Sequence, residues 1–458
     1  MSPISRPSPL TSARLSRRRF LTVAAMASAA VPILSACGSP TAGSSASFGQ
    51  PEVAPPAEYA GRTNVVMWSP WTGNNGDRLA TIIKDFNDSQ SEIYAEIQTF
   101  NGYDGVSEKL AAGLQARQIP DIAVFSDVHW NIFFLNGSLE PLDGYFTDDF
   151  GPATFHTRLF DEGVVRGQSF WVPYGRSTPL FYYNKEVFAA AGLPDRAPAT
   201  WEEFRGWDKE ITGRDYRGNR LQMRAYTGTD DWYFQGLLWN FGGGISEGLD
   251  VVLDTPESIT AAEFDRAIVN DDRIGYLAQS MNNDFTNGLV ATITNSTGSL
   301  TGLISGADFE VGAGFLPTAT TTGVPTGGGG LSIMKHSAPE RKEAAAKVLA
   351  YLSRPQPSAD WTVGTGYLPA TIGAAESATV QQRMAENPYY RLAVEQLDIA
   401  RQPDAVRRYV SSAIVEMRTA IQKLYTENAD AATTLRQTAE KLRVEADILR
   451  PRYEEMVA

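Results

Sequence analysis

The feature that most restricts the fold is a regular alternation of strand-like and helix-like segments in residues 64–126. "NVVMWS" reads as a buried strand, and the apolar residues of "GDRLATIIKDFNDSQ" recur at helical spacing. "YAEIQTF" and "DIAVFS" then read as strands on either side of a helix at "GVSEKLAAGLQARQ". Strands that alternate with helices pair in parallel, because a helical crossover returns the chain to the same end of the sheet. The sequence therefore predicts an α/β fold with a parallel sheet.

Polar residues follow two of these strands. Tyr103 comes just after the second strand and Asp127 just after the third. Ligands of open α/β sheets bind at the carboxyl ends of the strands, so both side chains are candidates for a binding rim. Each also has an ordinary interpretation, since Asp is common at turns and helix N-caps and Tyr is often half exposed.

The strand and helix pattern begins again at "RSTPLFYYNKEVFAAAGLP", from Arg176 to Pro194. This segment starts as an exposed-looking turn, becomes a dense apolar strand and continues into a helix. A core strand does not need such a start, whereas a strand that crosses from one lobe to another past a binding cleft does. Strands and helices then continue to Asp404, after which the pattern is helical to the end. The length of 458 residues indicates two or three compact units.

The N-terminus has the features of an export signal. In "SRRRFLTVAAMASAAVPILSAC", three arginines precede an apolar stretch that is too short to span a bilayer. The arginine pair resembles a twin-arginine signal, and Leu-Ser-Ala-Cys resembles a lipobox in which Cys37 is lipidated. An uncleaved anchor helix is the alternative. We predict a signal peptide at 1–36 and a lipidated Cys with a flexible tether, rich in Gly, Ser, Pro and Ala, at 37–61. The protein is then expected on the outer face of the cytoplasmic membrane.

The net charge and the cysteine content limit the kinds of partner and site that this protein can have. The formal net charge is −13, and the 422 residues after the predicted signal carry 35 basic and 53 acidic side chains. Such a surface repels nucleic acid and anionic membranes, so an anionic ligand needs a local positive site. The single cysteine excludes an intrachain disulfide. With only three histidines, at 129, 156 and 336, we expect no metal and no cofactor.

A secreted hydrolase, such as a glycosidase or a phosphodiesterase, is the alternative to a binding protein. The sequence contains no Gly-x-Ser-x-Gly motif, no metal-ligand cluster and no His placed as a general base. We therefore expect no enzymatic activity.

Five motifs occur in a recognisable order: "STPLFYYNK", "STGSL" at 296–300, "TGGGGLSIM" at 326–334, "TGYLP" at 365–369 and "AVRRYV" at 405–410. Over residues 62–445 they resemble the extracytoplasmic solute-binding proteins of ABC importers. "YYNK" and "GYLP" occur widely among sugar-binding relatives. The Ser-Thr-Gly-Ser turn, together with an Arg after "TGYLP", resembles the type that binds glycerol-3-phosphate and glycerophosphodiesters.

The resemblance implies a two-lobed periplasmic-binding-protein-like fold whose lobes are joined by three crossing segments and close on the ligand by a hinge. Lobe I would comprise residues 62–177 and 327–367, and lobe II residues 178–326 and 368–458. The implied partners are the permease subunits of an ABC transporter, and we expect a monomer.

The resemblance also assigns ligand contacts. Glycerol hydroxyls would be bound by Tyr103, Asp127 and Ser177; phosphate would be bound by Ser296, Gly328, Tyr367 and Arg407. The chemistry is suitable, because an ionised carboxylate accepts both hydrogens of a vicinal diol. The Ser-Thr-Gly-Ser turn offers backbone N–H groups at a helix start, and an Arg can pair a phosphate bidentately. Another glycine of "TGGGG" could replace Gly328, and Arg408 could replace Arg407.

Trp232 is a candidate wall for the far end of the ligand, with a core position as the alternative. An indole face attracts a trimethylammonium group, and Asp230 or Asp231 could add a favourable field. Some relatives carry a second Trp three positions earlier, where this chain has the smaller Thr229. This favours glycerophosphocholine over glycerol-3-phosphate. Because nine Trp and eighteen Tyr could stack on sugar rings, a neutral di- or oligosaccharide remains the alternative ligand.

Overall fold

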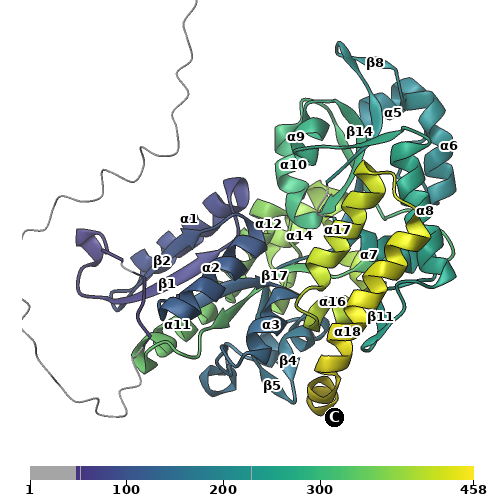
Figure 1. The fold of residues 1–458 in the computed structure, drawn as a ribbon. Coiled ribbons are helices and arrows are strands. Elements are labelled where there is room, and N and C mark those ends of the chain that lie inside the picture. Colours follow the sequence, from purple (N-terminus) through teal and green to yellow (C-terminus); the bar gives the residue numbers. More distant parts are fainter. Residues whose placement is uncertain (1–47, 52, 228–229, 458) are drawn as a thin grey trace, which may run out of the picture. The chain divides into compact units, whose positions relative to one another are not determined.

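The computed structural model describes residues 48–51, 53–227 and 230–457 (Figure 1). The predicted signal peptide, Cys37, the first part of the tether and Thr229 lie outside the described residues, so the predictions made for them stay predictions. In the described part of the chain, no helix combines the length and apolarity needed to cross a membrane.

The first sheet has five strands in the order β2-β1-β3-β17-β6. Its strands are β1 (Thr63–Ser69), β2 (Ile93–Thr99), β3 (Ile122–Ser126), β6 (Val172–Ser177) and β17 (Gly327–Ile333). The helices that connect or follow them are α1 (Gly73–Ser89), α2 (Gly102–Ala116), α3 (His129–Leu135) and α11 (Pro339–Leu352). The predicted alternation is therefore confirmed for residues 63–126, where β1 pairs in parallel with β2 and β3.

The sheet as a whole is mixed: the parallel pairing predicted from residues 64–126 holds for β1, β2 and β3, and a strand from later in the chain adds antiparallel pairs. Strand β17 pairs antiparallel with both β3 and β6. The physical reason is connectivity, since β17 enters this sheet directly after a long excursion through the second sheet. No helical crossover sets its direction.

The second sheet also has five strands, in the order β13-β10-β14-β7-β15. Its strands are β7 (Pro179–Asn184), β10 (Gln222–Tyr226), β13 (Gly275–Leu277), β14 (Val290–Ser296) and β15 (Val311–Gly314). The helices around it include α5 (Lys185–Ala191), α6 (Trp201–Ile211), α7 (Asp231–Asn240), α8 (Pro256–Asn270), α9 (Met281–Thr286) and α10 (Leu300–Gly306). Here β10 pairs in parallel with β13 and β14, and β7 runs antiparallel to β14 and β15.

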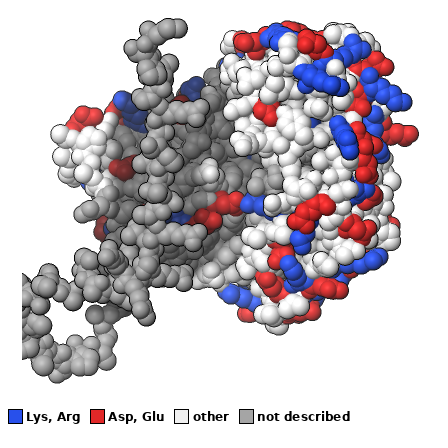
Figure 2. All heavy atoms as spheres, turned by 45° about the horizontal axis from the view of Figure 1, so that its top comes forward, with Lys and Arg blue, Asp and Glu red and all other residues white. Residues whose placement is uncertain are grey.

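After α11 the chain is helical apart from the short strand β18 (Ala400–Arg401), with a 3₁₀ helix at Gln396–Asp398 before it. It contains α12 (Pro355–Thr365), α13 (Ile372–Glu376), α14 (Ala378–Glu386), α15 (Pro388–Glu395), α16 (Ala405–Tyr409), α17 (Ala413–Thr426) and α18 (Ala431–Val457). The helical prediction after Asp404 is confirmed. Each sheet is the centre of its own lobe, with separate hydrophobic cores on its two sides. Figure 2 shows basic and acidic side chains interspersed over the visible face.

The three crossing segments lie side by side. Strand β6 ends at Ser177 and β7 begins at Pro179, so the chain passes from one sheet to the other across a single residue. Gly327 and Gly328, at the start of β17, pair with the end of β6. The third crossing contains the "TGYLP" motif at 365–369 and lies beside the other two. The N–H of its Leu368 donates to the carbonyl of Arg176 at 2.8 Å. The predicted lobe limits stay predictions.

The start of "RSTPLFYYNK" is not exposed, contrary to its appearance in the sequence. All four residues from Arg176 to Pro179 are buried. They lie at the junction of the two sheets, where the neighbouring crossings cover them.

Candidate functional site

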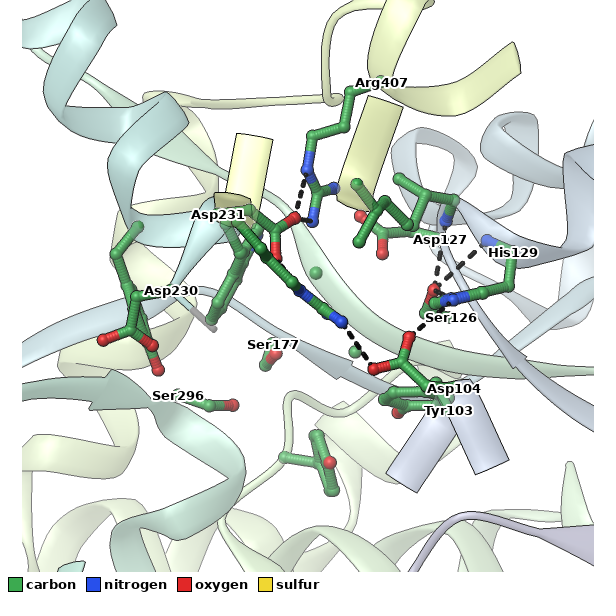
Figure 3. A pocket seen from close by; sticks show the side chains of 18 residues that line it. Tyr103, Asp104, Ser126, Asp127, His129, Ser177, Asp230, Asp231, Ser296 and Arg407 are labelled. Carbon is green, nitrogen blue, oxygen red and sulfur yellow. Dashed lines mark hydrogen bonds and ion pairs between the residues drawn. The ribbon is translucent and has the colours of Figure 1, made fainter. Parts of the chain in front are cut away.

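A cavity of about 260 Å³ is lined by residues from both sheets and from α2, α3, α7, α16 and α17 (Figure 3). The lining includes all eight residues predicted to contact ligand: Tyr103, Asp127, Ser177, Trp232, Ser296, Gly328, Tyr367 and Arg407. The structure therefore brings together the whole predicted set, although its members are spread over 305 sequence positions. Their ligand contacts stay predictions.

Strand ends place several of these side chains. Asp127 directly follows β3, Ser177 ends β6 and Ser296 ends β14. Tyr103 lies in the first turn of α2, after β2. The interpretation of Tyr103 and Asp127 as rim residues thus agrees with their positions in the fold.

Asp127 is a buried carboxylate with one unused oxygen. The residue is only 5% exposed, and its Oδ2 has no hydrogen-bond partner. Its backbone N–H donates to the carbonyl of Gly328 at 3.1 Å. Burial raises its pKa, and the charges of Arg176, Arg407 and His129 oppose that rise. The alternative of an exposed turn or N-cap residue is wrong, and Oδ2 is available to accept a ligand hydroxyl.

Two tyrosines also line the cavity. The hydroxyl of Tyr103 is buried and has no partner within hydrogen-bonding geometry. The hydroxyl of Tyr367 accepts from Nε1 of Trp71 at 3.0 Å, and its ring stacks on Trp361. Burial raises the pKa of both phenols, so they are neutral hydrogen-bonding groups. The Tyr367 ring also packs against Gly298, where an added Cβ would lie 2.5 Å from it.

The Ser-Thr-Gly-Ser turn does not provide the free N–H groups that we expected. Ser296 caps a short 3₁₀ helix (Thr297–Ser299), and its Oγ accepts from the N–H of Gly298 at 3.1 Å. The N–H of Thr297 donates to the carbonyl of Thr178 at 2.9 Å. Both donors are used within the protein because the turn must also join the first crossing segment. What this turn presents to the cavity is the Ser296 side chain.

Two glycines of "TGGGG" line the cavity, and at each of them there is no room for a Cβ. Gly328 has φ +82°, and a Cβ there would lie 2.0 Å from the carbonyl oxygen of Gly175. A Cβ on Gly327 would lie 2.3 Å from the ring of Trp232. The glycines therefore let β17 and the indole approach each other closely.

Arg407, not Arg408, lies at the cavity. Its Nε and Nη2 donate to Oδ2 of Asp231 at 3.0 and 2.6 Å, and the residue is 6% exposed. Arg408 instead bonds Gln402 at 2.8 Å and is not part of the lining. Because Asp231 uses two guanidinium nitrogens, only Nη1 of Arg407 has no partner. The expected bidentate pairing with phosphate is thus replaced, in this conformation, by pairing with Asp231.

Trp232 is a wall of the cavity and not a core residue. Its ring is partly buried, and Nε1 donates to the carbonyl of Thr326 at 2.8 Å. Tyr233 packs beside it, with ring centroids 5.0 Å apart. Asp230, next to them, accepts from the N–H and hydroxyl of Thr227, and burial raises its pKa to about 6.

Comparison with known proteins identifies the family. Residues 81–387 match the model of the bacterial extracellular solute-binding protein family. The chain belongs to this family. Its proteins are substrate-binding components of ABC transporters and do not catalyse reactions.

Similar proteins and structures extend this result. The sn-glycerol-3-phosphate-binding periplasmic protein UgpB of Salmonella typhimurium is 26% identical over 360 residues, covering 73% of this chain and 80% of that protein. A crystal structure of UgpB from Mycobacterium tuberculosis with glycerophosphocholine matches with a TM-score of 0.80 and 32% identity, over 84% of this chain and 99% of that one. The acarbose receptor GacH of Streptomyces glaucescens shares the fold, with a TM-score of 0.74 and 19% identity over 84% of this chain and 99% of the receptor.

The site of this solute-binding protein also contains a chain of ion pairs that the sequence did not reveal. Arg418 of α17 donates from Nε to Asp231 at 2.7 Å and from Nη1 to Asp104 at 2.6 Å. The other oxygen of Asp104 lies 3.0 Å from Nε2 of His129, whose Nδ1 lies 2.6 Å from Ser126 Oγ. Figure 3 shows this chain crossing from Asp231 to Ser126. Arg418 sits inside an ordinary amphipathic helix, so no local pattern marked it.

The balance of charge in the lining is acidic. Four Asp residues face two Arg residues, a formal net charge of −2 when His129 is uncharged. The pKa of Asp104 is lowered by its bonds to His129 and Arg418, so this carboxylate stays ionised. The described residues contain no cluster of His, Cys, Asp and Glu suited to a metal ion. The lining therefore combines a net negative formal charge with two cationic side chains.

Proposed function

We propose that this protein captures a glycerophosphodiester with a cationic head group, glycerophosphocholine being the first candidate, for uptake by an ABC importer. One observation carries the proposal: a single cavity combines a buried carboxylate, one free guanidinium donor and an indole wall within an acidic surround. These features match the diol, the phosphate and the quaternary ammonium of such a ligand.

The glycerol end is assigned to Asp127, Tyr103 and Ser177. Oδ2 of Asp127 and the hydroxyl of Tyr103 are both buried without partners. Leaving such groups unpaired costs about 1–3 kcal/mol each, and a bound diol would satisfy them. This requirement for hydroxyl groups is shared by glycerol derivatives and sugars.

The phosphate end is assigned to Arg407, Ser296, Tyr367 and Gly328. Nη1 of Arg407 is a buried cationic donor without a partner, and a charge-assisted bond from it to a phosphate oxygen would be strong in this buried setting. Because Asp231 balances much of the charge of Arg407, the site suits a phosphate that carries one negative charge.

Charge balance separates the candidate ligands. Glycerol-3-phosphate carries close to two negative charges at neutral pH, since the second phosphate pKa is about 6. It would enter a lining whose formal charge is already negative. Glycerophosphocholine has no net charge, and its ammonium can face Trp232 and Asp230. The structure of a relative in complex with glycerophosphocholine supports this choice.

A neutral sugar is the second candidate, because several proteins with this fold bind oligosaccharides. They include a maltose-binding protein from T. maritima with a TM-score of 0.74 and 22% identity. A cavity of about 260 Å³ lies below the usual range of ligand pockets, about 300–1,000 Å³, and its lining is charged. Both properties favour the smaller zwitterion over an oligosaccharide.

Isothermal titration calorimetry on the protein without its signal peptide tests the proposal. We expect saturable binding of glycerophosphocholine, weaker binding of glycerol-3-phosphate and no binding of maltose. Absence of heat and of any thermal shift with millimolar glycerophosphocholine would refute the assignment. Tighter binding of maltose or trehalose would select the sugar.

The head-group assignment has its own test in Trp232→Leu. Loss of the indole face removes a cation–π contact of about 0.5–2 kcal/mol. We expect weaker binding of glycerophosphocholine with an unchanged affinity for glycerol-3-phosphate, measured by calorimetry with both ligands. Equal losses for the two ligands would instead show that Trp232 supports the cavity as a whole.

A further inference from the structure

Arg176 is a buried cation next to the site. The residue is 0% exposed, so its guanidinium is not solvated. Its Nη2 pairs with the equally buried Glu162, and the guanidinium lies 5.0 Å from the centre of the Trp171 ring. Nε and Nη1 have no hydrogen-bond partners. Since burying a charge is costly, a guanidinium with only one ion-pair bond needs a further explanation.

The strand register places Arg176 close to Asp127. Gly328 of β17 is paired with Arg176 of β6, and its carbonyl accepts the N–H of Asp127 at the end of β3. Adjacent strands lie about 4.8 Å apart, so only one strand separates the two backbones. Gly328 has no side chain to stand between them.

The unpaired atoms of this region are complementary. Asp127 Oδ2 and Glu162 Oε1 are buried acceptors without partners, while Arg176 contributes two buried donors. Ser177, the next residue along β6, lines the cavity. Arg176 is not part of the cavity lining, but its charge acts on the lining residues Asp127, Tyr103 and Tyr367, so the guanidinium lies close behind the site.

We propose that Arg176 is a positioning residue that keeps Asp127 ionised, and thereby sets the affinity of the site for ligand hydroxyls. It never contacts the ligand itself. The part of this inference that concerns affinity rests on the proposed function. Among the charges that hold down the pKa of Asp127, that of Arg176 is the largest, ahead of Arg407 and His129.

The groups that face Asp127 come from several elements. Arg176 lies on β6, Arg407 on α16, His129 on α3 and Tyr103 on α2. Glu162, from the 3₁₀ turn at Asp161–Gly163, acts in the opposite sense to Arg176, and burial raises its pKa to about 7. Any test of Arg176 therefore has to hold the charge of Glu162 constant.

The decisive comparison is Glu162→Gln against the double variant Arg176→Met/Glu162→Gln. The two differ only at Arg176, and neither leaves an unpaired carboxylate. With ¹³C-labelled Asp carboxyl groups, the Asp127 resonance is assigned by its loss in Asp127→Asn, and its titration is followed by NMR. We expect the midpoint to be higher in the double variant, because removing a nearby cation disfavours the carboxylate.

A matched control tests for a merely structural effect. Arg341 and Asp121 form another ion pair with a fully buried carboxylate, outside the cavity lining. Arg341→Met/Asp121→Asn should lower stability without moving the Asp127 midpoint. Arg176→Lys/Glu162→Gln, which keeps the positive charge in the same background, should return the midpoint to that of Glu162→Gln. An unchanged or lower midpoint in the Arg176→Met double variant overturns the inference.

The pH dependence of ligand affinity tests whether the charge of Arg176 matters for binding. An ionised Asp127 binds ligand, so affinity falls as pH drops through its pKa, and this acid limb should move to higher pH in the double variant. We expect glycerophosphocholine affinity to fall about five- to tenfold at mildly acidic pH, with little change at pH 8. A raised midpoint with an unchanged pH profile of affinity also overturns the inference. If wild-type protein binds no glycerophosphodiester, the proposed function fails, and the titration midpoint alone decides the role of Arg176.

Discussion

Replacing Arg407 by Ala is expected to weaken the binding of glycerophosphocholine by about 2–5 kcal/mol, the usual cost of truncating one partner of a buried charge pair. The guanidinium is 6% exposed, and Nη1 is its one donor left for the phosphate. Without it, Asp231 would be balanced by Arg418 alone, and the lining would carry one more net negative charge. The loss of the phosphate contact and the stronger repulsion act in the same direction. Calorimetry with the purified variant measures the change.

Arg408→Ala is the matched control, because it removes the same kind of side chain one residue away. Arg408 bonds Gln402 and does not line the cavity. We expect its affinity to stay within twofold of the wild type. If Arg407→Ala also stays within twofold, Arg407 is not a phosphate ligand.

Gly328→Ala is expected to lower both the free energy of unfolding and ligand affinity. The conformation at φ +82° costs a residue with a Cβ about 1–3 kcal/mol. The new Cβ would also lie 2.0 Å from the carbonyl oxygen of Gly175. Because that oxygen belongs to the backbone, no side-chain rotation can relieve the clash. Strand β17 would have to move away from β6, and the backbone bond from Asp127 to Gly328 would move with it. Urea unfolding and calorimetry measure the two effects.

Gly206→Ala is the control for this change. Gly206 lies inside α6, and nothing within 4 Å would meet its Cβ. We expect a gain in stability of about 0.5–1 kcal/mol, because Ala is the better helix former, with unchanged affinity. If Gly328→Ala is as well tolerated as Gly206→Ala, the positive φ at Gly328 is not required.

Much of the fold followed from periodicity. The apolar spacing of Leu79, Ile82, Ile83 and Phe86 marked α1, and these four side chains are buried in the structure. Strand ends next to Tyr103 and Asp127 indicated where a ligand would bind. These are local properties of the chain, and a helix or strand face is set by residues at most a few positions apart.

The failures have a common cause. "RSTP" looked exposed because its residues are polar, yet the junction of three crossing segments buries it. The Ser-Thr-Gly-Ser turn looked ready to bind an anion, yet its donors are used by Ser296 and by Thr178, a residue 119 positions before Thr297. The composition of a segment indicates which groups it can bind. It does not indicate which distant parts of the chain pack against that segment in the folded protein.

The sequence by itself determined the class of fold, the strand ends that carry Tyr103 and Asp127 and, through its motifs, the set of residues gathered at one cavity. Only the tertiary structure decided how those residues are charged and paired. Arg418 meets Asp104 across 314 positions and Asp231 across 187, and Arg407 meets Asp231 across 176. No repeat or spacing encodes such pairs, because two distant segments become neighbours only when both lobes have formed and the crossings have brought them together.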